Sequence, residues 1–214
     1  MFYQITKPRL RLLDVRWRST FKRFCGPVPA GLGIASLLAE SNGNEDPTVR
    51  DIDTNPVGLM QIAQRDGRRY GYEKEDLQKP TINVFVWCAK TNTDSQWISQ
   101  LYSTYWSAPV IDYWLMVRLL FIVGQDMFKK LLSACSDAGN KTANVLAHLN
   151  TTSLRYGRYQ GTTLRRIVVH LEEVRTALIM LHGLRYQATS FGQTPLKNPG
   201  SDTAILEAVT RKDH

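Results

Sequence analysis

The sequence predicts a mainly α-helical fold, a helical bundle with at most a small β element. Two observations come from spacing: in residues 10–24 and again from Thr163 to Leu181, apolar side chains recur at steps of three and four, as on one face of a helix. A third is Pro80, a residue suited to the first turn of a helix, which opens another apolar stripe. The extended piece that we expect is short, Gly58 to Ile62.

The first 24 residues combine an apolar helical stripe with seven basic residues and one acid. They predict a basic amphipathic N-terminal arm, either a clamp on an anionic surface or an ordinary first helix docked on the core with solvated arginines. No unbroken apolar core occurs in this arm, so we expect no secretory signal and synthesis as a soluble cytosolic chain. The stripe consists of Leu10, Leu13, Trp17, Phe21 and Phe24.

The rest of the chain predicts one main domain over residues 25–187 with a C-terminal helical extension, followed by a tail or linker over 188–214 with a short helix. The chain has 214 residues and a net charge of +8, which suits anionic polymers such as nucleic acid, a membrane surface or the bacterial wall. The most apolar stretch, Val110 to Gly124, is too short for a membrane span and carries Asp112 and Arg118.

The cysteine and histidine positions predict neither a disulfide framework nor a metal site. Cys25, Cys88 and Cys135 are odd in number and show no C-x-x-C spacing, so we expect reduced thiols. The histidines stand alone, without a ligand partner at metal spacing, so we expect structural roles for them and no cofactor. This interpretation concerns His148, His170 and His182, three of the four histidines of the chain.

Glu40 is an acid at the end of a run of small and apolar residues, Ala30 to Ala39. Pro29 suits the start of a helix and Gly43 its end, so Glu40 belongs to the last turn. Nothing in the run would hydrate or pair with a carboxylate, and desolvation there should favour the protonated form. We therefore expect a general acid, although a helix-end glutamate that points into water is the plainer alternative.

Three motifs resemble the soluble lytic transglycosylase and goose-type lysozyme superfamily. They are Glu40-Ser41 at a helix end, Gly-Leu-Met-Gln-Ile from Gly58 to Ile62, and Asp-Leu-x-x-Pro-x-x-Asn-Val from Asp76 to Val84. The resemblance covers residues 27–87 well. It implies an α+β lysozyme-like fold in which the helical bundle surrounds a substrate cleft.

The resemblance also implies an activity on peptidoglycan, with no metal or cofactor. A lytic transglycosylase of this family uses a single glutamic acid, here Glu40, to cleave the β-1,4 bond between N-acetylmuramic acid and N-acetylglucosamine. Glu40 would protonate the glycosidic oxygen and then take the proton of the muramyl 6-hydroxyl, which closes a 1,6-anhydro ring. A hydrolytic goose-type muramidase would instead recruit Asp51 or Asp53 to activate water.

Further substrate contacts are expected around the catalytic acid. By resemblance, Gln61 lines the site, Met60 lies beside it, and Ser41 assists. Asn83 is expected to fix a helix start instead of touching substrate. The sequence departs from the family at Ala63 and Gln64, and also at Phe121 and Ile122, where the family has Tyr and Asn. Tyr105 or Tyr113 could supply the missing ring.

The missing signal together with the implied fold favours a bacteriophage virion, in which a tail or ejection protein opens the host wall locally and acts in the periplasm. The expected partners are peptidoglycan strands and phage proteins bound through the basic arm and the C-terminal tail, with no specific nucleic acid. The departures from the family leave a non-catalytic structural virion or ejection protein as the rival. A nucleic-acid binder, supported by the charge alone, is a third alternative.

Overall fold

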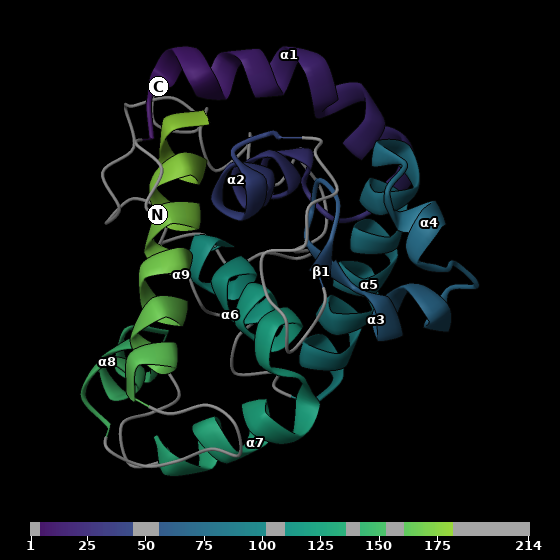
Figure 1. Cartoon of the computed structure of the whole chain (residues 1–214). Helices are drawn as coiled ribbons and strands as arrows, with labels where there is room; N and C mark the ends of the chain where they lie inside the picture. Colours follow the sequence, from purple (N-terminus) through teal and green to yellow (C-terminus); the bar gives the residue numbers. More distant parts are fainter. Residues whose placement is uncertain (1–4, 45–55, 102–109, 136–141, 153–160, 182–214) are drawn as a thin grey trace.

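The computed structural model describes residues 5–44, 56–101, 110–135, 142–152 and 161–181, and this part of the chain is mainly α-helical (Figure 1). The expected fold class is confirmed, including the small β element. The described helices are α1 Lys7–Phe24, α2 Ala30–Ser41, α3 Gln64–Arg69, α4 Lys74–Leu77, α5 Pro80–Leu101, α6 Val110–Val123, α7 Gln125–Ala134, α8 Thr142–Thr151 and α9 Gly161–Leu181. Strands β1 (Pro56–Val57) and β2 (Ile62–Ala63) pair antiparallel.

Helix α1 lies across α2 and buries the face that the sequence predicts (Figure 1). Leu10, Leu13, Trp17 and Phe21 are all buried, while Arg11, Arg16, Lys22 and Arg23 are exposed. The two helices approach closely at Gly33, where a Cβ would lie 2.3 Å from the ring of Phe21. The basic helix is therefore packed against the core with its charges in solvent, as in the second of the two expectations.

Helix α2 is the most enclosed helix of the described part, with every residue from Ala30 to Leu38 buried. It packs against α1 and α9. The helix ends one residue earlier than the sequence suggests, because Asn42 already adopts the left-handed conformation and its N–H bonds the carbonyl of Leu38. Arg9 of α1 donates hydrogen bonds to the Asn42 side chain and carbonyl, so α1 also holds this helix end.

The segment Gly58 to Gln61 is a tight turn, and the expectation of a continuous extended piece up to Ile62 was wrong. Gly58 and Gln61 both have positive φ, 73° and 47°, which turns the chain between β1 and β2. Asn83, fully buried in α5, accepts a hydrogen bond from the Met60 N–H and donates to the carbonyls of Val57 and Leu77. Its expected structural role is confirmed: it joins the hairpin to α4 and α5.

Cys25 and Cys88 form a disulfide, so the expectation of reduced thiols was wrong for this pair. The sequence argument failed because the two cysteines are 63 residues apart and meet only when α1 packs on α5. Phe21 and Trp87, near the same junction, contact edge to face with ring centroids 5.7 Å apart. Cys135 is a free, buried thiol.

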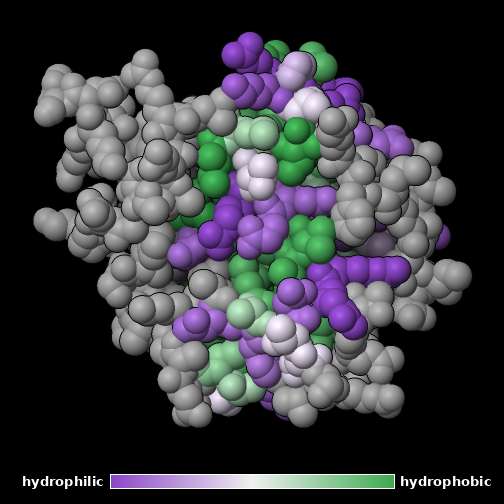
Figure 2. Space-filling model, turned by 90° about the vertical axis from the view of Figure 1, so that its left-hand side faces the viewer, coloured by the Kyte–Doolittle hydropathy of each residue, from purple (hydrophilic) through white to green (hydrophobic). Residues whose placement is uncertain are grey.

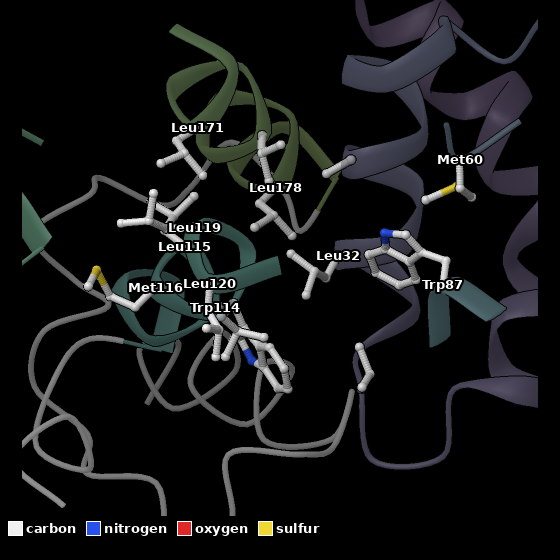
Figure 3. Close-up of a cluster of buried hydrophobic side chains, with 14 of the residues drawn as sticks. Leu32, Met60, Trp87, Trp114, Leu115, Met116, Leu119, Leu120, Leu171 and Leu178 are labelled. Carbon is white, nitrogen blue, oxygen red and sulfur yellow. The ribbon is translucent and has the colours of Figure 1, made fainter. Parts of the chain in front are cut away.

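A large part of the core lies between α6 and α9, with Leu32 of α2 nearby (Figure 3). The apolar stripe that the sequence predicts on α9 packs inward, with Leu164, Ile167, Leu171, Val174 and Leu178 all buried. Trp87 and Trp114 are fully buried, so both are core residues.

On the face shown in Figure 2, hydrophilic and hydrophobic surfaces alternate in patches among the coloured residues. The exposed large apolar side chains of the described part are few, with Leu12 and Val15 on α1 and Val169 on α9. None of the helices in that part is long and apolar enough to cross a bilayer.

Candidate functional site

Glu40 is paired with a buried cation, contrary to the expectation that nothing near it would pair with a carboxylate. Its Oε1 contacts Nη2 of Arg118, which comes from α6, and only 1% of the Arg118 side chain is exposed. Arg118 comes from a distant helix, so the run before Glu40 gives no indication of this partner. The pairing favours the ionised carboxylate, whereas the predicted general acid needs the protonated form. Glu40 remains 19% exposed, so solvent reaches it.

His170 of α9 completes this group, which we call the Glu40 cluster: Glu40, Arg118 and His170. Nε2 of His170 lies 3.2 Å from Nη2 of Arg118 and 3.7 Å from Oε1 of Glu40. An arginine can only donate, so Nε2 of His170 accepts and the imidazole is neutral. Burial and then the Arg118 charge lower the pKa of His170 from 6.5 to about 3, although 18% of its side chain stays exposed.

Arg118 has more donors than its neighbours use. Its Nε and Nη1 are buried without a hydrogen-bond partner, while its guanidinium carbon lies 4.7 Å from the ring centroid of Phe121. Burial lowers the pKa of Arg118 to about 9, so the cation persists at neutral pH. Glu40 is the carboxylate within ion-pair distance of it among the described residues, which makes their pairing the main charge balance of the cluster.

Phe121 separates the Glu40 cluster from a second polar region. Lys90 of α5 lies against the same aromatic ring, with its Nζ 4.1 Å from the centroid, and donates a hydrogen bond to the Phe121 carbonyl. Lys90 also pairs with Asp94, one turn further along α5, at 2.8 Å. Phe121, which departs from the family pattern, thus contacts two cations.

The second region is a pocket of about 480 Å³ between α3, α5 and the junction of α6 with α7, which we call the Asp66 pocket. Its walls include Asp66, Lys90, Asp94 and Phe121, whereas the three residues of the Glu40 cluster do not line it. Asp66 and Asp94 are each only 6% exposed. Two enclosed carboxylates in a cavity of this size make it a candidate ligand site.

The two carboxylates of the pocket influence each other. Burial raises the pKa of Asp94, Lys90 opposes that change, and the negative charge of Asp66 adds to it. Oδ1 of Asp66 is buried and accepts no hydrogen bond. Its nearest cations, Arg65 and Arg69, lie 3.6 and 3.7 Å away with most of their side chains in solvent. Asp66 is therefore enclosed but incompletely satisfied.

The other predicted substrate residues lie in mainly structural positions. Ser41 is buried and its hydroxyl bonds the Leu37 carbonyl and the Gly43 N–H, which closes the end of α2. Met60 is fully buried in the core. Gln61 donates its side-chain amide to the Gly58 carbonyl within its own turn, at 2.7 Å.

Tyr113 cannot supply a substrate-facing ring, so this expectation was wrong. It is 1% exposed, and its hydroxyl is bonded by Ser95 and Ser99 of α5. The reason is that Tyr113 lies on the face of α6 that packs against α5. Tyr105, together with Asp51 and Asp53 of the hydrolytic alternative, lies outside the described residues.

Sequence reasoning missed Arg118, His170, Asp66 and Asp94. Arg118 did carry a signal: it is a permanent cation inside the most apolar stretch of the chain, and such a residue needs a buried partner. His170 gave no comparable signal. Asp66 carries no sequence signal of burial, because its neighbours Arg65, Arg68 and Arg69 dominate the local composition.

Comparison of the chain with protein-family models, with curated proteins and with solved structures finds no significant match. Within the described residues, no group of three or more histidine, cysteine, aspartate or glutamate side chains could hold a metal ion. The candidate sites therefore rest on their own geometry.

Proposed function

We propose that the protein is a peptidoglycan lytic transglycosylase with Glu40 as its catalytic residue. The observation that carries the proposal is the position of Glu40: it stands in the last turn of the buried helix α2, is partly exposed, and is held by side chains from two other helices. The ordered series of sequence motifs and the hairpin after α2, tied to α5 by Asn83, add support.

The proposed reaction places two demands on Glu40. In the first step its proton goes to the glycosidic oxygen, the bond to the anomeric carbon breaks, and N-acetylglucosamine leaves as an alcohol. In the second step the carboxylate accepts the proton of the muramyl 6-hydroxyl while that oxygen bonds the anomeric carbon, so no water is consumed. The contact with Arg118 matches the ionised form in which Glu40 begins the second step. The first step requires the bound glycan to move Glu40 away from Arg118.

The proposed setting is a bacteriophage particle whose protein opens the wall locally and works in the host periplasm. The Cys25–Cys88 disulfide supports action in an oxidising compartment, since disulfides persist in the periplasm and are rare in the cytosol. Peptidoglycan strands are the proposed substrate, and tail or ejection proteins are the proposed partners.

Mass spectrometry of digested sacculi tests this function. A transglycosylase releases muropeptides lighter by one water than the products of a hydrolase, and the goose-type alternative gives unmodified reducing ends. Glu40→Gln should lower the rate by about 10²–10⁴-fold, because it removes the transferable proton. The double variant Glu40→Gln/Arg118→Met contains no unpaired buried charge and must be equally inactive if the loss is chemical.

One observation favours a second function, a structural virion or ejection protein without the reaction. The pair of Glu40 with the buried Arg118 links α2 to α6, as a purely structural ion pair would. This alternative predicts intact sacculi with the wild-type protein under every condition. A folded wild-type protein that releases no muropeptide, at a concentration at which a known muramidase clears the same sacculi, would replace the enzyme proposal with the structural one.

A further inference from the structure

The side of α1 that faces away from the core carries an exposed apolar strip. Leu12 and Val15 are 64% and 86% exposed, and they are two of the three exposed large apolar residues in the described part of the chain. Because a helix has about 3.6 residues per turn, they lie together with Ser19 on the side opposite the buried stripe. Figure 1 shows α1 along one edge of the molecule, with α2 on its inner side.

Cations flank this apolar strip on both sides. Each of the four is exposed, and helical spacing places two on either side of the strip. The acid that α1 contains, Asp14, is paired with Arg18 at 2.7 Å and so does not neutralise them. We call the strip and its four cations the α1 outer face. The cations are Arg11 and Lys22 on one side, and Arg16 and Arg23 on the other.

We propose that the α1 outer face binds the surface of an anionic phospholipid bilayer. The four cations contact the phosphates of the lipid headgroups, while Leu12 and Val15 enter the headgroup layer. The contact is peripheral, because the opposite side of α1 is buried against α2 and α5.

The exposed apolar pair favours a bilayer over nucleic acid as the partner. A phosphate backbone attracts cations, but it offers Leu12 and Val15 no apolar environment in which to leave water. A bilayer surface accepts both kinds of side chain at once. Since the Glu40 cluster takes no part in this contact, the contact can be tested independently of glycan cleavage.

Flotation of vesicles with the whole chain measures the contact. Vesicles with roughly one-third phosphatidylglycerol should bind the protein at least about tenfold more tightly than vesicles of phosphatidylcholine alone, because the attractions of several cations to an anionic surface add. Raising the salt concentration should weaken the binding, since salt screens exposed charges. Equal binding to the two kinds of vesicle, or no binding to the anionic vesicles at low salt, would overturn the proposal.

The variant Arg11→Gln/Lys22→Gln tests the charged part of the α1 outer face. It removes two of the four cations and should weaken binding to the anionic vesicles about tenfold or more. The matched control is Arg165→Gln/Arg166→Gln, which removes two exposed cations from α9 and should weaken binding by no more than about twofold. Equal effects of the two double variants would mean that net charge, and not the α1 outer face, attracts the protein to the membrane.

The variant Leu12→Gln/Val15→Gln tests the apolar part without changing the charge. It should weaken binding to the anionic vesicles about threefold or more, because apolar area that enters the headgroup layer is lost. Val169→Gln on α9 is the control, since this side chain is 37% exposed, and it should leave the binding unchanged. If Leu12→Gln/Val15→Gln binds the vesicles as tightly as the wild type, the α1 outer face recognises charge alone, and a polyanion such as nucleic acid replaces the bilayer as its partner.

Discussion

The Glu40 cluster and the Asp66 pocket both contact Phe121 but differ in how their enclosed charges are paired. In the cluster, a fully buried arginine meets a carboxylate directly, and a neutral histidine accepts one of its hydrogen bonds. In the pocket, an enclosed aspartate has only distant and solvated cations, next to open space. A carboxylate in direct contact with a buried cation favours a fixed structure, whereas an enclosed carboxylate whose nearest cations are distant and solvated contributes little to it.

The largest effect that we expect comes from the disulfide, which joins the segment before α2 to α5 and so supports both regions. Closing a loop of 63 residues should stabilise the fold by roughly 4 kcal/mol through the entropy of the unfolded chain. Cys25→Ala/Cys88→Ala should lower the free energy of unfolding in urea by this amount. Dithiothreitol should have the same effect on the wild type and none on the double variant.

The control for the disulfide is Cys135→Ala, which removes the free thiol and keeps the bridge. Its stability should still fall on reduction as that of the wild type does. If reduction leaves the wild type unchanged, the two cysteines do not restrain the unfolded chain, and the argument for an oxidising compartment loses its support.

Removing one partner of the Glu40–Arg118 pair should lower the free energy of unfolding by somewhat less than loss of the disulfide does. Glu40→Gln leaves the Arg118 cation buried with only a neutral acceptor, which should cost about 3 kcal/mol, at the lower end for a broken buried pair. Arg118→Met should lower the free energy of unfolding by less than Glu40→Gln does, because Glu40 is partly exposed and water can hydrate it. The double variant should recover stability to within about 1 kcal/mol of the wild type. Additive losses in urea denaturation would mean that the two side chains are not coupled.

His170 should make the cluster sensitive to acid. The native histidine stays neutral down to about pH 3, whereas in the unfolded chain its pKa is 6.5, so the unfolded state binds the extra proton between these values. Stability contributed by His170 is therefore fully present above pH 6.5 and is lost as the pH falls toward 3. The expected slope is up to about 1.4 kcal/mol per pH unit. His170→Gln should show a shallower slope between pH 6 and 4 in urea denaturation, and an equal slope would contradict the neutral assignment.

Local patterns of the sequence were enough to predict α1, α2, the start of α5, and α9, together with the buried faces of α1 and α9. The spacing of Leu10, Leu13, Trp17 and Phe21 identifies the inner face of α1 because a helix repeats every 3.6 residues. The hairpin turn was harder to predict, since Gln61 adopts a positive φ that residues other than glycine rarely adopt. Asn83 could be recognised as structural because it stands at the start of a predicted helix.

The sites could be predicted only in part, because their partners come from distant helices. Glu40 was correctly recognised as an unusual acid, but the run around it contains nothing that indicates Arg118 or His170. The disulfide could not be predicted for the same reason: Cys25 and Cys88 meet through the packing of α1 on α5. Asp66 was hidden by its basic neighbours, since burial of one residue in a charged stretch depends on tertiary contacts that composition does not contain.

The smallest effect, and the sharpest contrast with Glu40→Gln, is expected for Asp66→Asn. Asp66 pairs loosely with two arginines that are mostly in solvent, and such pairs contribute little, so its loss should change the free energy of unfolding by no more than about 0.5 kcal/mol. The variant should also lower the pKa of Asp94, because the Asp66 charge is one of the causes that raise it. Titration of the Asp94 carboxyl carbon by NMR measures this shift directly. A loss of stability as large as that of Glu40→Gln, with no change at Asp94, would mean that Asp66 is a structural ion pair and that the two regions do not differ.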